Sequence, residues 1–459
     1  MDNKHELIFE SYLNEENLFI TGPGGSGKTF SIKRIYDHAK TTTKNIYVTA
    51  LTGVAAILLD CNATTIHTWS GIGIGNKTDT QIINKIFKSE FYRHNWISTD
   101  ILIIDEISML SLRLFELLDK IGRLIRSNKK PFGGIQVIFS GDFFQLPPVK
   151  ETFFCFESNI FNNSFDKIIN LTVIFRQNDN VYKKLLLNMR KGLISKKSIE
   201  ILNNKVIKST NESTNESTNE STNESTNEST NESAKINNIY DDMKITRLVP
   251  TKNKANNINE HFLNSIKEKK YIYKRTCKET KGDLTITEKC KLSVMTEDEK
   301  NYEYNFIKSS TLTEETLILK KGAFVMCISN LDLESGIANG STGTIIDFTT
   351  EKLPIVQFDK CKMVINKKEW KSENIPGISL FQIPLILAWG ITIHKAQGLT
   401  LEKAIVNVGK DIFEAGQMYV ALSRLKNLDG LYIEDFNLDN LKINYKVFNF
   451  YEKLEKQDN

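Results

Sequence analysis

Two short stretches of the sequence carry residue types that suit phosphate chemistry. The first is GPGGSGKT, which follows the apolar run LFI and fits the spacing Gly-x-x-x-x-Gly-Lys-Thr. Glycines let backbone N–H groups approach a phosphate, and the N-terminus of a following helix favours negative charge. Lys28 would place a point charge on the phosphate oxygens, and the Thr29 hydroxyl is suited to ligating Mg²⁺. We expect the phosphates to be held by Gly22, Gly24, Gly25, Ser26, Gly27, Lys28 and Thr29.

The second stretch is ILIIDE, an apolar run that ends in Asp105 and Glu106. Ligands of parallel α/β sheets bind at the carboxyl ends of the strands, where these acids would lie. Asp105 is then the expected partner of Mg²⁺, and Glu106 can orient or deprotonate an attacking water. The structural alternative is that the acids cap the next helix, since Ser108 and Ser111 are close by. Two acids directly after a buried strand, in a chain that also carries the glycine loop, favour catalysis.

A third polar stretch, GDFFQLPPV, follows another apolar run. Asp142 and Gln145 would lie at the same edge of the sheet, where a glutamine can hydrogen-bond a γ-phosphate and respond to its loss. A proline-stiffened turn whose glutamine faces solvent fits these residues equally well. The three stretches together allow a kinase, a nucleotide switch or a motor, so the rest of the chain has to decide between them.

Four apolar runs alternate with helical stretches through residues 1–175, which is typical of a parallel α/β sheet. They are NLFITG, NIYVTAL, ILIIDE and GIQVIFSGD. Between the last two, LRLFELLDKIGRLIRSN repeats apolar residues at helical spacing and predicts an amphipathic helix packed on the sheet. After Lys244 we predict a strand, a turn and a helix. The stretch from KKGAFVMCISN to LPIVQFDK predicts short antiparallel strands that form a small β-barrel.

Composition and charge exclude several classes of protein. The chain has 459 residues, 40% apolar and 25% charged, and its net charge of +4 does not by itself indicate nucleic acid. Six cysteines without a C-x-x-C pair indicate reduced thiols, and neither a disulfide framework nor a zinc site. The apolar run 383–393 is too short to span a bilayer, and the first residues lack the apolar core of a secretory signal. We therefore expect a soluble intracellular protein with no mitochondrial presequence and no membrane partner, in the nucleus, or in the cytoplasm of a virus-infected cell or a bacterium.

Residues 209–232 repeat the sequence STNE six times. A segment without apolar residues cannot bury enough surface to offset the entropy of ordering, so we expect residues 209–233 to be disordered. Its serines and threonines would allow Ca²⁺ binding or phosphorylation, but a repeat expansion tolerated in a surface loop is the simpler interpretation.

Eight stretches, in this order along the chain, resemble the motifs of the PIF family of superfamily 1B DNA helicases, which is related to RecD. The resemblance runs from about residue 17 to 430 and is weak across residues 251–320. It implies ATP in a cleft between two RecA-like lobes, with single-stranded DNA across both lobes, 5′-to-3′ translocation and duplex unwinding. It also implies work in DNA repair, recombination, replication or telomere maintenance. The stretches are GPGGSGKT, TALTGVAA, TIHTWSGIG, DEISM, KPFGGIQVIFSGDFFQLPPV, LTVIFRQ, AWGITIHKAQGLTL and GQMYVALSRL.

The resemblance also implies a domain organisation of the α/β class, with parallel sheets flanked by helices. Lobe 1A would cover residues 1–175, with a small 1B wedge at about 71–98. Lobe 2A would begin in residues 176–208 and 234–320, interrupted by the disordered repeat, and finish in residues 383–459. An SH3-like 2B module would occupy residues 321–382, in agreement with the β-rich stretch found there.

Further site residues follow from the resemblance. Arg176 of FRQ and Arg424 of ALSR would be arginine fingers that reach ATP from the other side of the cleft. A guanidinium stabilises charge on the transferring phosphoryl group, so fingers from a second lobe would make hydrolysis require closure. Gln397 and Gly398 would approach the phosphates, and Gln145 the γ-phosphate. The resemblance places near the DNA backbone Thr52, Gly53, Thr65, His67, Thr392 and His394.

Three aromatic residues near these motifs allow two interpretations. Trp69, Phe143 and Phe144 can stack on bases, or they can pack in the core. One departure from the family pattern concerns the nucleotide base. The segment before LFITG contains no glutamine of the kind that reads adenine, and His5 or Asn14 would be weak substitutes, so we predict a looser choice of nucleotide.

Three functions compete for this chain. The first is an ATP-dependent helicase that acts on single-stranded and forked DNA as a monomer with Mg²⁺. The second is a DNA-stimulated ATPase, either a remodeller or an accessory subunit, that does not separate strands alone. The third is a P-loop kinase of a small metabolite, which would need neither HKAQG nor ALSR in a second α/β half.

Overall fold

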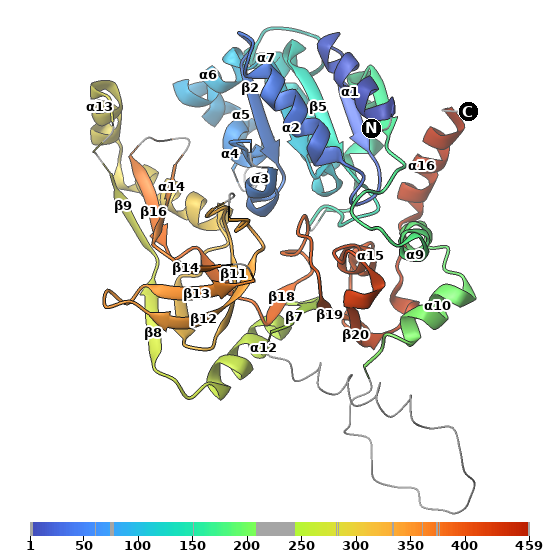
Figure 1. The fold of residues 1–459 in the computed structure, drawn as a ribbon. Helices are drawn as coiled ribbons and strands as arrows, with labels where there is room; N and C mark the ends of the chain where they lie inside the picture. Colours follow the sequence, from blue (N-terminus) through green and yellow to red (C-terminus); the bar gives the residue numbers. More distant parts are fainter. Residues whose placement is uncertain are drawn as a thin grey trace, which may run out of the picture.

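The computed structural model shows two lobes, each built on a parallel sheet, and a third part made of antiparallel strands (Figure 1). The STNE repeat and its expected disorder lie outside the described residues. No helix formed by the described residues is long and apolar enough to cross a membrane. The structure describes residues 3–59, 61–73, 78–149, 151–207, 244–280, 282, 284–332, 335–359, 361–372, 375 and 377–457.

The first lobe is a six-stranded parallel sheet with the order β3-β2-β4-β5-β1-β6. Its central strands β1, β4 and β5 are buried along their whole length, because helices cover both faces, and this explains why their sequences are continuous apolar runs. The four predicted strands are confirmed. The strands are β1 (Leu18–Thr21), β2 (Ile46–Ala50), β3 (Thr64–Thr65), β4 (Ile101–Asp105), β5 (Gln136–Gly141) and β6 (Lys167–Asn170).

The helices of the first lobe include the predicted amphipathic helix, α7. Ser111 caps α7 by accepting a hydrogen bond from the Leu114 N–H at 3.2 Å, and Leu118 and Ile121 of its apolar face are fully buried. Two helices, α5 and α6, occupy most of the region proposed as the 1B wedge. The helices are α1 (Asn3–Leu13), α2 (Lys28–Ala39), α3 (Gly53–Leu59), α4 (Ile66–Ser70), α5 (Asp79–Lys88), α6 (Glu90–Ser98), α7 (Leu112–Ile125) and α8 (Phe161–Ser164).

The second lobe is a smaller parallel sheet with the order β18-β7-β19-β20. The strand, turn and helix predicted after Lys244 are β7 and α12, so this prediction is also confirmed. Most of the stretch GQMYVALSRL forms α15. The strands are β7 (Thr246–Val249), β18 (Gly390–Thr392), β19 (Ala404–Val408) and β20 (Leu431–Phe436). The helices are α9 (Asn180–Arg190), α10 (Lys196–Asn203), α12 (Lys252–Ser265), α15 (Gln417–Leu422) and α16 (Tyr445–Gln457).

The antiparallel part is larger than the predicted 2B module of residues 321–382. Residues 234–320 are predicted as part of the second lobe, but within them β8 and β10 pair with each other, and β9 pairs with β16 of the predicted module. At the other end, β17 pairs with β11. These hydrogen bonds fall within the antiparallel part, which therefore extends over residues 270–387. Its five-stranded sheet has the order β14-β13-β12-β11-β17. The SH3-like character of this sheet stays a prediction.

The elements of the antiparallel part complete the fold. The strands are β8 (Lys270–Lys274), β9 (Thr276–Glu279), β10 (Thr316–Lys320), β11 (Phe324–Cys327), β12 (Thr342–Phe348), β13 (Pro354–Phe358), β14 (Lys362–Val364), β15 (Lys368–Lys371), β16 (Ile378–Gln382) and β17 (Leu385–Leu387). The helices are α13 (Ile286–Val294) and α14 (Glu297–Ser310).

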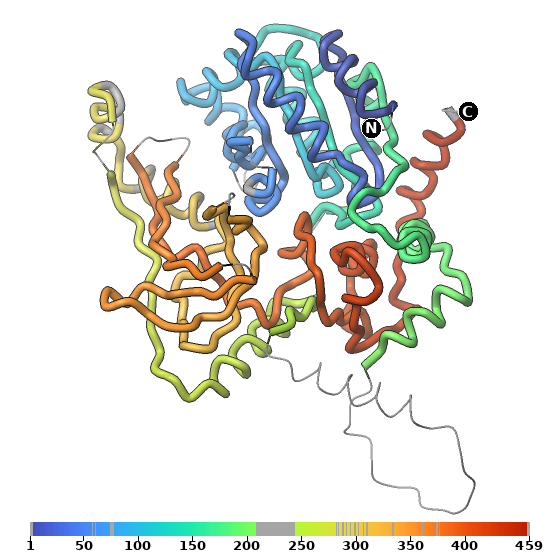
Figure 2. Tube along the Cα trace, viewed as in Figure 1, coloured from blue at the N-terminus to red at the C-terminus, as the bar shows by residue number. Residues whose placement is uncertain are grey.

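Each lobe buries side chains in the core of the other lobe. Leu146, which follows β5 of the first lobe, is fully buried in the core of the second. In the other direction, α16 leaves the second lobe and rises along the side of the first (Figure 2). Its Val447, Tyr451 and Leu454 are buried in the aromatic core of the first lobe. The two halves are therefore joined by packed side chains as well as by the connecting chain.

Candidate active site

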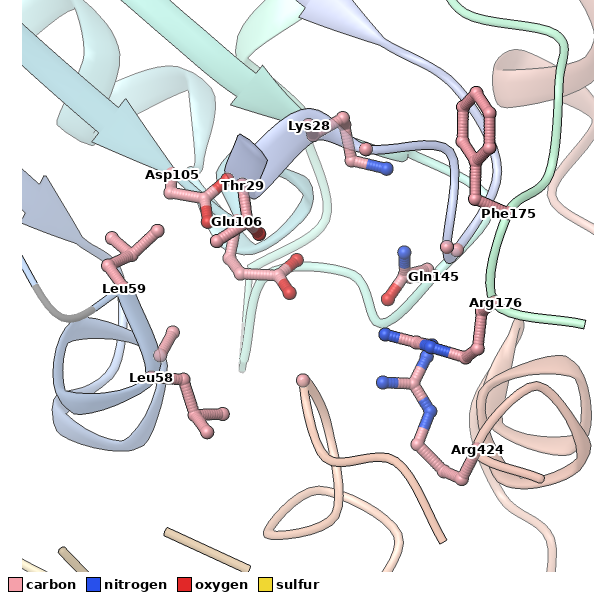
Figure 3. A pocket seen from close by; sticks show the side chains of 15 residues that line it. Lys28, Thr29, Leu58, Leu59, Asp105, Glu106, Gln145, Phe175, Arg176 and Arg424 are labelled. Carbon is pink, nitrogen blue, oxygen red and sulfur yellow. The ribbon is translucent and has the colours of Figure 1, made fainter. Parts of the chain in front are cut away.

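A cavity of about 350 Å³ lies between the two lobes at the carboxyl ends of the first sheet (Figure 3). The second lobe contributes Gly398 and Arg424, so both lobes form its wall. Among the predicted nucleotide residues, Gly22, Ser26 and Gln397 are not part of the lining. The lining residues are Gly24, Gly25, Gly27, Lys28, Thr29, Ala55, Leu58, Leu59, Asp105, Glu106, Gln145, Phe175, Arg176, Gly398 and Arg424.

The glycine loop leads into α2 as its sequence predicts. Gly27 precedes α2 with a left-handed backbone, φ 89°, which glycine adopts without strain. The Lys28 ammonium donates to the carbonyl oxygens of Gly22 at 2.7 Å and Pro23 at 3.0 Å, so it is folded against its own loop. Burial lowers the pKa of Lys28, and three nearby carboxylates act in the opposite direction. A phosphate oxygen can replace these carbonyls as the acceptor and compensate the buried charge more fully.

Asp105 and Glu106 stand at the end of β4, and Figure 3 shows the Glu106 carboxylate directed into the cavity. Glu106 has a left-handed backbone, φ 55°, and its side chain caps no helix. Because Ser111 caps α7, helix capping does not account for the two acids. Burial raises the pKa of Asp105, and burial together with the neighbouring Asp105 raises the pKa of Glu106 to about 7.

Gln397 and Gly398 reach the first lobe in different ways. The Gln397 Nε2 donates to the Glu106 Oε2 at 3.1 Å, which ties the second lobe to the acid. Gly398 has φ 83°, and a Cβ added there would lie 2.4 Å from the Leu58 Cδ1. The second lobe therefore touches both the acid and α3 at this point.

Arg424 enters the cavity from the end of α15 (Figure 3). Its Nε donates to the Val420 carbonyl at 3.0 Å, and its Nη2 donates to the Ser423 hydroxyl at 2.8 Å. Burial and the nearby Arg176 guanidinium lower the pKa of Arg424 to about 9, so the side chain stays protonated at neutral pH. The guanidinium groups of the buried Arg424 and the partly buried Arg176 share one cavity with the Lys28 ammonium, which suits a ligand with several negative charges.

Arg176 reaches the cavity by a different route from the predicted one. We expected it to come from the far side of the cleft, but its backbone N–H donates to the Gly25 carbonyl at 3.3 Å, and that of Phe175 donates to the same oxygen at 2.8 Å. The segment after β6 therefore lies directly on the glycine loop. The tip of the side chain crosses to the second lobe, where its Nη1 donates to the Ser423 carbonyl at 3.2 Å. Arg176 thus connects the loop to the residue before Arg424.

Gln145 lies in the cavity wall as predicted. Its backbone N–H donates to the Asp142 carbonyl at 2.9 Å, which forms a tight turn. Within the described part of the chain, its Oε1 and the Ser26 hydroxyl are buried without a hydrogen-bond partner. Buried polar atoms normally have partners, so these two keep a capacity for a ligand or water. On the loop itself, the Gly24 N–H donates to the Tyr419 hydroxyl of α15 at 2.9 Å.

Thr29 and Asp105 are the side chains that suit Mg²⁺. The described residues contain no group of three or more histidine, cysteine or acidic side chains arranged to hold a metal ion. Mg²⁺ is usually held by one or two protein groups, and phosphate oxygens and waters complete its octahedron. A buried carboxylate at a strand end, beside the threonine of the glycine loop, fits that pattern (Figure 3).

Two exposed phenylalanines and a buried histidine gather beside the glycine loop. The His5 ring lies 5.8 Å from the Phe30 ring and 5.9 Å from the Phe175 ring, and its Nδ1 is hydrogen-bonded to the Ser31 hydroxyl at 2.8 Å. Phe175 is 52% exposed and lines the cavity, which makes it the natural surface for a nucleotide base. Sequence reasoning missed Phe175, although it directly precedes Arg176.

The threonines predicted to contact DNA each stand at or just after the carboxyl end of a parallel strand. Thr52 follows β2, Thr65 ends β3 and Thr392 ends β18. Their hydroxyl oxygens accept a hydrogen bond from the backbone N–H three residues later: Ala55 at 3.2 Å, Thr68 at 3.2 Å and Lys395 at 3.2 Å. The Thr52 and Thr392 hydroxyls are thereby held in place and retain a proton for a phosphate oxygen, whereas the Thr65 hydroxyl also shares a hydrogen bond with the Thr68 hydroxyl at 2.7 Å.

The other predicted DNA residues accompany these threonines. Gly53 begins α3, and His67 belongs to α4, which follows Thr65. His394 follows β18 and stacks on Phe413 with ring centroids 6.1 Å apart. Burial lowers the pKa of both histidines, so they favour the neutral form.

The three aromatic residues considered for base stacking belong to the core instead. Trp69 is 2% exposed and packs on Trp96 with ring centroids 4.6 Å apart. Phe143 is 2% exposed, and Phe144 is 6% exposed and stacks on Tyr451 at 4.8 Å. Because their faces are occupied by other side chains, they offer no surface to a base in this conformation.

Known proteins resemble this chain along its whole length. Residues 4–200 match the family model of PIF1-like helicases, and residues 304–348 match that of the 2B domain of the DNA helicase Pif1. The chain is 32% identical, over 100% of its length, to the ATP-dependent DNA helicase PIF1 of Xenopus laevis. It covers 65% of that relative.

Solved structures agree with the sequence relatives. The crystal structure of Pif1 helicase from Candida albicans is 30% identical with a TM-score of 0.74, and 99% of each chain is covered. The structure of Pif1 helicase from Bacteroides in complex with ADP-AlF3 and ssDNA is 26% identical with a TM-score of 0.63, over 99% of this chain and 97% of that one.

Proposed function

The chain belongs to the PIF1-like helicase family, and from that membership we propose that it is an ATP-dependent helicase that moves 5′ to 3′ on single-stranded DNA and unwinds duplex DNA. One observation supports this proposal most strongly. Arg424 of the second lobe lines the same cavity as Lys28 and Glu106 of the first lobe, and Gln397 of the second lobe donates a hydrogen bond to Glu106. A site divided between two lobes lets hydrolysis change how the lobes are held, which a small-molecule kinase does not need.

The site residues have distinct roles in this proposal. Lys28, Arg176 and Arg424 stabilise charge on the transferring phosphoryl group, and Gln145 hydrogen-bonds the γ-phosphate. Glu106 orients the attacking water and accepts its proton. Thr29 and Asp105 would hold Mg²⁺, which would supply charge neutralisation on the phosphates. The loop glycines and Ser26 surround the phosphates.

The route from ATP to DNA runs through α3. Thr52 and Gly53 stand at the start of this helix, while Leu58 near its end lines the cavity and meets Gly398. We propose that the strand lies across the carboxyl ends of β2, β3 and β18, where hydroxyls hold its phosphates without reading sequence. A shift of the second lobe would then change the spacing between the two groups of phosphate contacts, which is what a translocation step requires.

We also propose that one chain is sufficient for ATP hydrolysis. Both arginines of the cavity, Arg176 and Arg424, come from the same chain as the glycine loop. A second copy is therefore not needed to complete the ATP site, although it could act on the same fork.

A strand-displacement assay tests the proposed function. Substrates with a 5′ tail or a 3′ tail are compared, and we expect ATP-dependent unwinding of the 5′-tailed duplex alone. Lys28→Ala serves as the control, because it removes the charge on the phosphates and is expected to abolish both ATPase activity and unwinding. Unwinding from a 3′ tail would contradict the polarity. ATPase activity stimulated by single-stranded DNA without unwinding would support the remodeller, and an ATPase that DNA does not stimulate would support the kinase.

The base-binding end of the cavity leads to a prediction about nucleotide choice. We propose that the base stacks with its face on Phe175 and that no side-chain amide hydrogen-bonds its edge to distinguish adenine. We expect kcat/KM for ATP, GTP and CTP to agree within about tenfold, because stacking tolerates every base whereas hydrogen-bonded sites reject analogues strongly. Steady-state hydrolysis in the presence of DNA measures this.

Two substitutions test the role of the ring. Phe175→Ala should raise KM for the three nucleotides alike. Phe153→Ala is the matched control, since Phe153 is 53% exposed and lies outside the cavity lining. A preference for ATP of a thousandfold would show that a polar group reads adenine after all.

A further inference from the structure

A buried ion pair joins the turn that carries Gln145 to the second lobe. Asp142 is fully buried, and the Arg190 guanidinium donates to it three times: Nε to Oδ2 at 3.0 Å and to Oδ1 at 3.1 Å, and Nη2 to Oδ1 at 2.8 Å. Asp142 also accepts from the Phe144 N–H at 3.2 Å, and its carbonyl accepts from the Gln145 N–H. The carboxylate therefore sets the shape of the turn and is itself held by Arg190.

Tyr451 of α16 fixes the same point. Its hydroxyl accepts from the Phe143 N–H at 3.2 Å and is hydrogen-bonded to Thr21, the last residue before the glycine loop, at 2.5 Å. The Arg190 guanidinium carbon lies 4.8 Å from the centre of the Tyr451 ring and 4.6 Å from that of Phe144. The pair thus stands where β1, the turn after β5, α9 and α16 meet.

Arg190 is the last residue of α9, and the other end of this helix is hydrogen-bonded to the backbone beside Arg424. The Tyr182 hydroxyl donates to the Leu422 carbonyl at 2.7 Å, two residues before Arg424. Just before the helix, the Gln177 Nε2 donates to the Ser423 carbonyl at 3.2 Å and to the Leu425 carbonyl at 2.9 Å. Tyr182 is fully buried, so this end of α9 is fixed to the backbone around Arg424.

We propose that α9 is a rigid strut that couples the position of Arg424 to that of Gln145, with Tyr182 and Arg190 as positioning residues for ATP hydrolysis. This inference rests on the proposed ATPase site. An α-helix transmits a displacement along its axis with little change in length, because each residue is fixed by a hydrogen bond to its neighbour four residues away. When Arg424 moves toward the phosphoryl group, the strut would bring the Gln145 turn with it.

The chemistry of the Asp142 end favours a positioning role over simple support. A buried ion pair is often no more stabilising than apolar side chains of the same volume, so packing alone gives no reason for a charged pair here. What the pair supplies is direction, because a guanidinium and a carboxylate hold one another in a planar, two-point arrangement. The Tyr182 hydroxyl likewise fixes α9 to a defined carbonyl.

A double-mutant cycle in kcat tests the strut. Tyr182→Phe removes the hydroxyl and keeps the ring, and Arg190→Lys keeps the charge and loses the two-point geometry. We expect each substitution to lower the kcat of DNA-stimulated ATP hydrolysis about tenfold with KM for ATP within about twofold, as for residues that act through another. A strut fails when either end is released. The kcat of the double variant should therefore be about tenfold below that of the wild type, as for each single variant, and not about a hundredfold below it.

The control and the opposing outcomes are defined by the same helix. Lys191→Gln removes the half-exposed ion pair with Glu455 directly after α9 and should leave kcat unchanged. The strut would be overturned if the kcat of the double variant fell by the product of the two single effects, or if the single variants hydrolysed ATP at the wild-type rate. If Arg190→Lys does not fold, Tyr451→Phe is used in its place. The Tyr451 hydroxyl lies 3.5 Å from Asp142 and is hydrogen-bonded to Thr21, so its removal loosens the same end of the strut. A wild-type chain without DNA-stimulated ATPase activity would instead refute the proposed function, before any variant is compared.

Discussion

Replacing Arg424 by lysine is expected to lower the kcat of DNA-stimulated ATP hydrolysis by about 10³-fold or more, the effect that arginine fingers have in phosphoryl transfer. The guanidinium uses its Nε on the Val420 carbonyl and its Nη2 on the Ser423 hydroxyl. It therefore faces the cavity in a fixed orientation with its remaining donors. A lysine ammonium is a point charge on a flexible stem, so it can serve either the helix or the phosphoryl group. Single-turnover hydrolysis with enzyme in excess measures the chemical step.

Weaker nucleotide binding or incomplete folding of the variant could also lower kcat, so both are measured. We expect Arg424→Lys to change the dissociation constant for ADP only slightly, because the finger acts on the transferring group. Arg176→Lys is the matched variant, since Arg176 lines the same cavity and is partly buried, and it should lower kcat as well. Thermal unfolding checks that the buried lysine is tolerated. A kcat for Arg424→Lys within tenfold of the wild type would contradict its role as a finger.

Replacing Glu106 by glutamine should reduce kcat by about 10²–10⁴-fold, the range of a general base in proton transfer. Glutamine has nearly the same shape, and its carbonyl oxygen can still accept the bond from Gln397 that the carboxylate accepts at 3.1 Å. The substitution therefore removes the base and leaves the contact between the lobes. Rapid-quench hydrolysis measures the loss, and a fluorescent ATP analogue measures binding.

The expected signature of this variant is tight binding without turnover. Glu106→Gln should bind ATP and single-stranded DNA at least as well as the wild type, since one buried negative charge beside the phosphates is gone. Lys28→Ala, which loses a charge on the phosphates, should bind ATP poorly. A Glu106→Gln variant that hydrolyses ATP within a few-fold of the wild type would show that another group deprotonates the water.

The first lobe could be predicted from local sequence because its strands are buried on both faces. β1, β4 and β5 are continuous apolar runs, and each ends at the sheet edge where the chemistry is, so motif residues far apart in the chain were expected together. The amphipathic pattern of α7 was equally informative. The polar residues at the ends of these elements, Lys28, Glu106 and Gln145, do line one cavity.

Other features depend on contacts that local patterns do not encode. β8 and β9 are short, half-exposed strands, and their partners β10 and β16 follow about 45 and 100 residues later, so nothing local places them in the antiparallel part. Trp69 and Phe144 have the same side chains whether they stack on a base or fill a core. The family pattern identified Arg176, but its attachment to the glycine loop is made by backbone atoms, which carry no sequence signal.

The crossing of α16 has a consequence for biosynthesis. On the ribosome, the first lobe emerges long before Val447, Phe450 and Tyr451, which complete its aromatic core. Until Phe450 has left the ribosome, Phe143 and Phe156 lack a ring that packs against both of them in the folded protein. The nascent lobe therefore exposes an apolar face, a situation in which chaperones usually intervene. Termination of translation before Val447 would leave that face exposed and direct the product toward aggregation or degradation.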